Sequence, residues 1–268
     1  MSLGFSVEAL APKARGGALR MGLERVAEAD WLMPLPDTAT RAAHFDAHPD
    51  AVQLLPQATA AGDEVAALLG VPGGLAGAAR AVWEDLCILM PDAATQQYRL
   101  VAGAVAFPTD WHLPDKLGLP LAAIHAPIHG YAEQLAGGVD HFFRTLAAGP
   151  IFGRSNWFVV ANADWRYLPQ DDPAQRFAHV SAANAGDTLF VRCERQTLRR
   201  LPVTGAVLFT IGIHVAPLGA LSAGLARRLA QAIGSVNSGE HERRAAPFYA
   251  EAMAGYVAAL GHILEIEK

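Results

Sequence analysis

The alternation of apolar and polar residues predicts helices towards both ends of the chain and strands between them. Apolar residues recur at helical spacing in five segments, at residues 52–69, 78–89, 131–147, 218–233 and 247–266. A sixth helix is predicted at residues 38–47, since Asp37, Thr38 and Thr40 can cap its first turn. The glycine-rich segment 70–77 is predicted to be a loop, because no strand precedes it and no Gly-Lys-Ser/Thr sequence follows it.

Nearly continuous apolar runs predict four strands in the middle of the chain, at residues 98–107, 156–161, 188–195 and 206–215. The first run has too little polar alternation for a half-exposed strand, so we expect it to be central in its sheet. The last two are separated by a short polar connection and should pair antiparallel. A weaker strand or turn is expected within residues 18–32. Helices around antiparallel strands indicate an α+β fold.

Composition narrows the class of protein. The 268 residues are 52% apolar and 18% charged, which argues for a globular chain and against disorder. The formal net charge of −5 disfavours a general nucleic-acid binder, because phosphate binding needs a basic face. Cys87 and Cys193 lack a CxxC spacing and are expected to be free thiols. Without a secretory signal or a long apolar span, we expect a cytoplasmic protein outside the membrane.

Residues 107–131, FPTDWHLPDKLGLPLAAIHAPIHGY, form the most informative stretch. They connect a predicted strand to a predicted helix through a long loop that contains prolines 108, 114, 120 and 127. Connections of this length without regular structure are usually functional. We therefore expect this loop to form one wall of a cofactor pocket.

Three histidines in this loop, His112, His125 and His129, are candidate ligands. Pro127 separates the last two, so they do not share a helix face, and no HExxH motif is present. The three imidazoles could form an open zinc site, or one of them could be the axial ligand of a haem. Alternatively, each could simply bond a turn or a backbone carbonyl. The prolines around His125 favour a functional role for that residue, since a rigid loop holds a ligand in place.

The segment RCERQTLRRLP, residues 192–202, has polar residues on both faces of a predicted strand. A buried guanidinium needs an anionic partner. Glu194 could be that partner, in an ion pair internal to the hairpin. Alternatively, Arg195 or Arg199 could bind a carboxylate or phosphate through two hydrogen bonds, and haem propionates would suit this site.

Four segments resemble a known family. They are MGLERVAEADWL at 21–32, the loop 107–131, RSNWF at 154–158 and ERQTLRRLPVTGAVLFTI at 194–211. Their order and spacing are similar to those of the haem-dependent oxidative N-demethylase alpha-subunit family, over nearly the whole chain. The chain departs from that pattern at Gly130, which follows Ile128-His129, and at the segment Gly212-Ile213-His214.

The resemblance implies one domain over residues 1–268, with a PAS-like antiparallel sheet at about 98–216 and helical additions at both ends. It implies a haem b cofactor and oxygen-dependent demethylation of a small secondary amine such as dimethylamine, with release of formaldehyde. Electrons would come from NADPH through a flavin and iron–sulfur reductase partner.

Specific roles follow for the residues that match the family. His125 would ligate the iron, and His129 is the alternative ligand. Trp111 would pack on the macrocycle, and the positive groups that could neutralise the propionates are Lys116, Arg195 and Arg200. Glu194 would orient the protonated amine, since a buried carboxylate attracts a small cation. A PAS-like sensor or binding protein without turnover is the alternative function, because fold alone does not determine activity.

Overall fold

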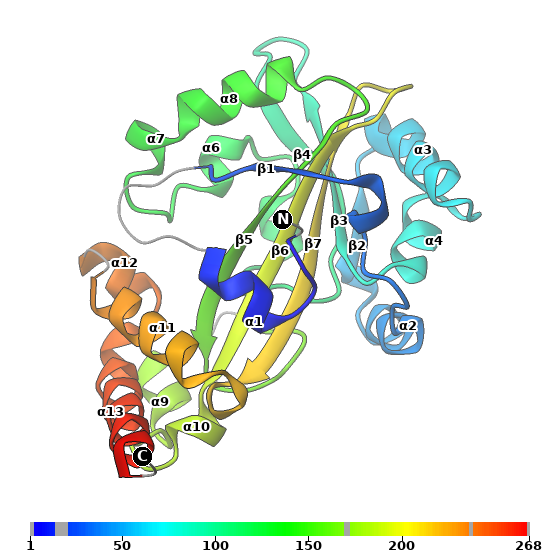
Figure 1. The fold of residues 1–268 in the computed structure, drawn as a ribbon. Helices are drawn as coiled ribbons and strands as arrows, with labels where there is room; N and C mark the ends of the chain where they lie inside the picture. Colours follow the sequence, from blue (N-terminus) through cyan, green and yellow to red (C-terminus); the bar gives the residue numbers. More distant parts are fainter. Residues whose placement is uncertain (1–2, 14–20, 169–171, 236–237, 267–268) are drawn as a thin grey trace.

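The protein is built on one antiparallel sheet of seven strands (Figure 1). The computed structural model describes residues 3–13, 21–168, 172–235 and 238–266. The strand order is β1-β5-β6-β7-β3-β4-β2. The strands are β1 Glu24–Val26, β2 Val52–Leu54, β3 Asp85–Pro91, β4 Tyr98–Ala104, β5 Ile151–Val160, β6 Phe190–Arg200 and β7 Val207–Pro217.

Helices cover both faces of the sheet and one of its ends. The helices before the long loop are α1 Val7–Leu10, α2 Thr38–Ala47, α3 Thr59–Leu69 and α4 Gly74–Ala81. The loop itself carries α5 Leu113–Lys116 and α6 Leu121–Ile124, and α7 Tyr131–Gln134 and α8 Ala136–Thr145 follow it. The later helices are α9 Pro173–Phe177, α10 Ala185–Thr188, α11 Ala223–Ser235, α12 Ser238–Arg243 and α13 Ala250–Ile266.

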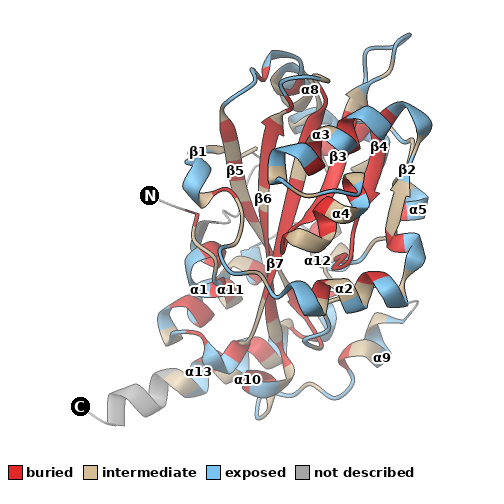
Figure 2. Cartoon of the chain, turned by 90° about the vertical axis from the view of Figure 1, so that its right-hand side faces the viewer, coloured by how far each residue is buried: buried red, intermediate tan, exposed pale blue. Residues whose placement is uncertain are grey.

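The sheet has two differently covered faces. Helices α2, α3 and α4 lie over the strands in the view of Figure 2, and together with α1 they cover what we call the N-terminal face. The long loop and α8 cover the opposite face, which we call the loop face. The central strands are mostly buried (Figure 2), because both of their faces are packed. Among the described residues, the buried apolar side chains form four clusters, one of which lies beneath the C-terminal helices.

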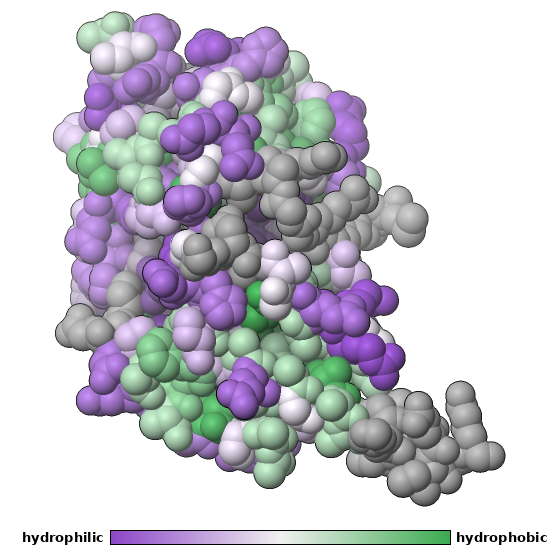
Figure 3. All heavy atoms as spheres, turned by 90° about the vertical axis from the view of Figure 1, so that its left-hand side faces the viewer, coloured by the Kyte–Doolittle hydropathy of each residue, from purple (hydrophilic) through white to green (hydrophobic). Residues whose placement is uncertain are grey.

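The C-terminal helices α9 to α13 gather at the lower left of Figure 1. Their main contacts join α11 to α13, where Leu225, Leu229 and Met253 are buried. Figure 3 shows that the lower part of this side of the molecule is more apolar than its upper part. The alanine-rich sequences of α11 and α13 explain this difference. Within the described residues, no helix has the length and hydropathy needed to span a membrane.

Most of the predicted elements are present, and the α+β class is confirmed. The β6–β7 hairpin pairs antiparallel from Phe190↔Pro217 to Arg200↔Val207. Helix α2 begins at Thr38, where the Asp37 carboxylate accepts a hydrogen bond from the Thr40 N–H at 2.9 Å. The strand predicted at 98–107 is β4. It is paired on both sides, with β3 and with the short edge strand β2, so it is the second strand from the edge of the sheet.

Two predicted helices are wrong in part. The segment 78–89 contains the end of α4 and then β3, whose first five residues are all buried. A strand with both faces buried shows no period of two, so its apolar residues matched a helical spacing by chance. The segment 52–69 begins with β2, and α3 begins only at Thr59, after Pro56. Part of the predicted loop 70–77 is helical, since α4 begins at Gly74.

Candidate cofactor site

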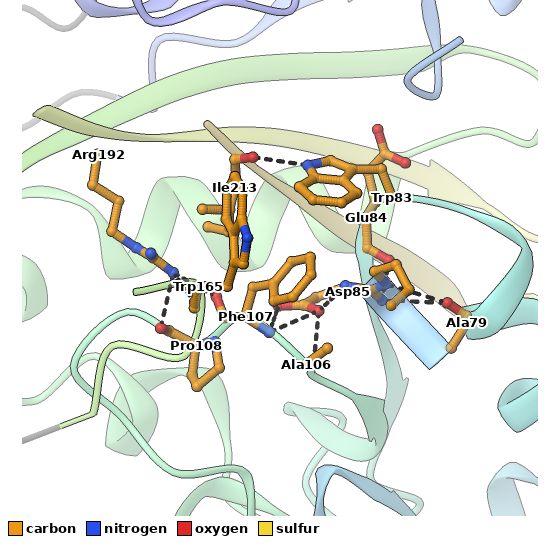
Figure 4. Close-up of polar contacts among 11 residues, drawn as sticks. Ala79, Trp83, Glu84, Asp85, Ala106, Phe107, Pro108, Trp165, Arg192 and Ile213 are labelled. Carbon is orange, nitrogen blue, oxygen red and sulfur yellow. Dashed lines mark hydrogen bonds and ion pairs between the residues drawn. The ribbon is translucent and has the colours of Figure 1, made fainter. Parts of the chain in front are cut away.

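A buried ion pair fixes the start of the long loop (Figure 4). The Arg41 Nη1 atom lies 2.7 Å from Asp85 Oδ1, and both side chains are almost fully buried. The same carboxylate accepts hydrogen bonds from the backbone N–H groups of Ala106, at 2.8 Å, and Phe107. Arg41 also donates to the carbonyls of Glu84 and Ala79. The chain therefore leaves β4 in one defined direction.

Arg192 holds the next residues of the loop. Its guanidinium donates to the carbonyls of Phe107, Pro108 and Trp165 at 2.8 to 3.0 Å, and its Nε donates to the Thr109 hydroxyl at 2.8 Å. The fully buried Arg192 guanidinium is therefore hydrogen-bonded to uncharged oxygen atoms. Phe107 also packs against Trp165 and Trp83, whose indole N–H donates to the Ile213 carbonyl (Figure 4).

The middle of the loop presses closely on the sheet. A Cβ atom at Gly103 of β4 would come within 2.5 Å of the Leu113 side chain, so any larger residue there would require that side chain to shift. Lys116 donates from Nζ to the Ile124 carbonyl at 3.0 Å, immediately before His125. Trp111 is half-buried and packs against the cluster that contains Leu113. The loop is therefore a packed structure that can hold an imidazole in a fixed place.

His125 bonds a backbone carbonyl, as the alternative interpretation of the loop histidines predicted, and this bond leaves its other ring nitrogen available. Its Nδ1 atom lies 2.8 Å from the Leu121 carbonyl, and its ring stacks on Tyr131 at 4.6 Å. Since a carbonyl only accepts, Nδ1 carries the proton and Nε2 keeps its lone pair. Burial lowers the pKa of His125 from its ordinary value, which favours the neutral imidazole. Ligating histidines usually bond a carbonyl or carboxylate through the other ring nitrogen in this way.

Glu194 is a buried carboxylate on the loop face of β6. Its Oε2 atom accepts a hydrogen bond from the Gln196 amide at 2.8 Å. Burial raises the pKa of Glu194 above its ordinary value, while the Thr109 hydroxyl and the nearby Arg192 oppose that rise. Among the described residues, no cation lies within ion-pair distance of this carboxylate. The internal ion pair considered from the sequence is therefore absent, and the carboxylate could receive a cationic ligand.

Arg154 is the residue that sequence reasoning missed. It lies on β5 opposite Gln196 of β6, and therefore on the same face of the sheet as Glu194. Burial lowers the pKa of the Arg154 guanidinium, and the negative charge of Glu194 opposes this shift. The positive charge of Arg154 in turn lowers the pKa of His125. Within the described residues its guanidinium has no hydrogen bond or ion pair. The alternation in RSNWF, with Arg154 and Asn156 on one face of the strand, was the available signal.

The other predicted ligand positions are more dispersed. His129 is exposed, and its backbone N–H donates to Glu240 of α12 at 3.3 Å. His112 is half-buried at the start of α5. In the part of the chain that the structure describes, no three histidine, cysteine or acidic side chains are grouped to hold a metal ion. The three loop histidines therefore do not form the zinc cluster considered as an alternative.

Arg195 and Arg200 have backbone partners. Arg195 follows Glu194 in the strand and points to the N-terminal face, where it donates to the carbonyls of Gly4, Asp30 and Trp31. Arg200, at the end of β6, donates to the carbonyls of Leu146, Phe143 and Gly205 and to the Tyr98 hydroxyl. These contacts fasten distant segments to the sheet. A role for either residue in binding a cofactor stays a prediction.

His214 and Glu84 lie near Arg195 on the N-terminal face. His214 is one of the positions that depart from the family pattern. Burial and the Arg195 charge lower its pKa to about 4, and its Nε2 atom is buried without a hydrogen-bond partner. The Glu84 Oε1 atom accepts from the Met33 N–H at 2.8 Å, beside Gly212. This buried cluster is separated by the sheet from His125 and Glu194.

Two side chains on the loop face have chemistry that suits a haem. A neutral imidazole with a free Nε2 suits the iron, and the partly buried guanidinium of Arg154 suits a propionate. The fold and this site define an α+β protein in which the candidate imidazole ligand His125 and the side chains of Glu194 and Arg154 lie on one face of an antiparallel sheet.

Comparison with known proteins identifies the family. The family model of the haem-dependent oxidative N-demethylase, alpha subunit-like, matches residues 72–253. The chain belongs to this family, as its sequence motifs predicted. None of the curated proteins gives a significant match to the chain.

Proposed function

We propose that the chain is the haem-binding subunit of an oxygenase that removes a methyl group from a small secondary amine. The observation that carries this proposal is the 2.8 Å contact between His125 Nδ1 and the Leu121 carbonyl, which leaves Nε2 available to iron. Family membership supports the haem dependence. The antiparallel sheet with flanking helices is consistent with a PAS-like domain.

Bound haem would supply the redox chemistry, in which one methyl carbon is oxidised to formaldehyde while O₂ is reduced. The residues of the chain would bind and orient the reactants. His125 would hold the iron, Arg154 would pair with a propionate, and Trp111 would pack beside the macrocycle. Lys116 is a second candidate for a propionate, besides its bond to the Ile124 carbonyl. The electrons would come from NADPH through a flavin and iron–sulfur partner subunit.

Glu194 would bind the protonated amine. Its carboxylate is buried, with the Gln196 amide and the Thr109 hydroxyl as its hydrogen-bond partners. A small ammonium ion would place a positive charge against it, and an ion pair in a dry site is strong when both charges are hydrogen-bonded. Thr109 and Gln196 would keep the carboxylate oriented.

Replacing Glu194 with glutamine should weaken amine binding at least tenfold, because a charge-assisted hydrogen bond contributes about 1.5–3 kcal/mol. The measurement is formaldehyde release from dimethylamine by haem-loaded protein with O₂ and a reductant. Glu133→Gln, the same change at an exposed position of α7, is the control. Unchanged KM in Glu194→Gln would remove this residue from the site. Haem binding without formaldehyde would favour the sensor function.

Replacing Arg154 with glutamine should weaken haemin binding about tenfold, because one charge-assisted hydrogen bond to a propionate is lost. The measurement is a haemin titration of the full chain followed by its absorption spectrum, which needs no turnover. Arg144→Gln on the exposed side of α8 is the matched control. Equal haemin affinity in the two variants would show that Arg154 does not contact the propionates.

A further inference from the structure

An aromatic ring covers one face of the His125 imidazole. The ring of Tyr131 lies nearly parallel to it, with an interplanar angle of 11° and 4.6 Å between the ring centroids. Tyr131 is the first residue of α7 and its side chain is buried, whereas His125 is partly buried. The imidazole is therefore stacked on a residue that is itself held in place by packing.

Two consecutive turns bring the two rings together. The backbone N–H of Ile128 donates to the His125 carbonyl at 2.9 Å, and the N–H of Tyr131 donates to the Ile128 carbonyl at 3.1 Å. Gly130 precedes α7 with a φ of 80°, in the left-handed region that glycine adopts without strain. The chain thus folds back on itself within this segment, and the Tyr131 side chain returns over His125.

The hydrogen bond to Leu121 and the stack on Tyr131 restrain different motions of the imidazole. The Leu121 carbonyl accepts from the His125 backbone N–H at 3.0 Å and lies 2.8 Å from Nδ1. This bond selects the nitrogen that carries the proton, but the ring could still turn about the axis of the bond. A parallel stack opposes that rotation, because a turned ring would lose its contact with the tyrosine face.

The plane of the ring matters for a metal ligand. The lone pair of Nε2 lies in the plane of the imidazole, so this plane sets the direction in which the nitrogen can reach a metal ion. Burial, and to a lesser extent the charge of Asp140, raise the pKa of Tyr131 to about 12, so its phenol is uncharged near neutral pH. Tyr131 can therefore act on the imidazole through its ring and not through a charge.

We propose that Tyr131 is a positioning residue whose ring fixes the imidazole plane of His125 for binding iron. This inference rests on the proposed haem-binding function and adds a residue to it. Tyr131 acts through His125 and touches neither the iron nor the substrate. A ligand that is already oriented loses less freedom when the metal binds, so its affinity for the metal is higher.

Haemin titration of the full chain, followed by absorption, tests this role. Tyr131→Leu keeps an apolar side chain without a flat face and should weaken haemin binding about tenfold, since losing the partner of a metal ligand costs 10–100-fold. Tyr131→Phe keeps the ring and should bind haemin as the unmodified protein does. Tyr249→Leu is the matched control, because Tyr249 is also buried and packs on an aromatic ring, that of Phe177, at 5.0 Å. It should leave haemin binding unchanged.

A spectroscopic measurement reports the orientation of the imidazole directly. Cyanide added to the ferric haem gives a low-spin state whose electron paramagnetic resonance g values depend on the plane of the imidazole on the other side of the iron. The unmodified protein, Tyr131→Phe and Tyr249→Leu should share one narrow set of g values. Tyr131→Leu should give a shifted or broadened set, which a loss of stability alone would not produce.

The outcomes separate this inference from the proposed function. If the unmodified chain binds no haemin, the proposed function is wrong and the role of Tyr131 is wrong with it. If the unmodified chain binds haemin and Tyr131→Leu matches it in affinity and g values, only the role of Tyr131 is overturned. Equal weakening by Tyr131→Leu and Tyr131→Phe would also overturn it, because the effect would then belong to the hydroxyl group.

Discussion

The His125→Ala variant is expected to lose haem binding. In the unmodified protein, haemin should give a Soret absorption band that saturates at one haem per chain. Removing the imidazole removes the only protein bond to iron in the proposed site. The apparent dissociation constant should rise at least about 100-fold, since even losses in the surroundings of a metal ligand cost 10–100-fold. A haemin titration followed by absorption measures this effect.

Two other histidines provide the controls for this experiment. His129→Ala changes an exposed residue of the same loop, and His141→Ala changes an exposed residue of α8. Both variants should keep the band. If His129→Ala loses it and His125→Ala keeps it, the ligand is His129. If all three variants bind haemin as the unmodified protein does, the proposed iron site is wrong.

The Asp85→Ala variant is expected to destabilise the fold by about 3–5 kcal/mol, because it leaves a buried charge without its partner. Arg41 would keep only carbonyl partners, at Ala79 and Glu84. The N–H groups of Ala106 and Phe107 would lose their acceptor. Urea unfolding followed by circular dichroism measures the change in the free energy of unfolding.

An exposed ion pair of the same length is the matched control. Arg80 and Asp46 also lie 2.7 Å apart, but their side chains are 41% and 69% exposed. Asp46→Ala should therefore change stability by at most about 1 kcal/mol. Similar small effects of Asp85→Ala and Asp46→Ala would show that the buried pair does not stabilise the loop. If the Asp85→Ala protein loses haemin binding at temperatures where it is still folded, the Arg41–Asp85 pair also positions the loop that carries His125.

Several parts of the site were accessible from the sequence. The prolines around His125 predicted a shaped loop, and the structure shows a packed loop with a carbonyl-bonded imidazole. The β6–β7 hairpin was predicted from its apolar runs. Glu194 was singled out as a polar residue in a buried strand, and it is buried.

Other parts depend on contacts between distant residues. Arg154 joins Glu194 only through the register of β5 on β6, across 40 positions of the chain. The bond from Arg192 to Thr109 spans 83 positions. No local pattern indicates which of many possible registers forms, because register depends on how whole faces pack.

The sequence by itself determined the α+β class, the family and the chemistry that the long loop can offer, because periodicity, turn residues and motifs are local properties. Only the tertiary structure decided which segments the charged residues of β6 contact. Neighbouring residues of a strand point to opposite faces, so Glu194 meets the loop while Arg195 meets the N-terminal segment. Which face receives which segment depends on the packing of the whole chain around the sheet.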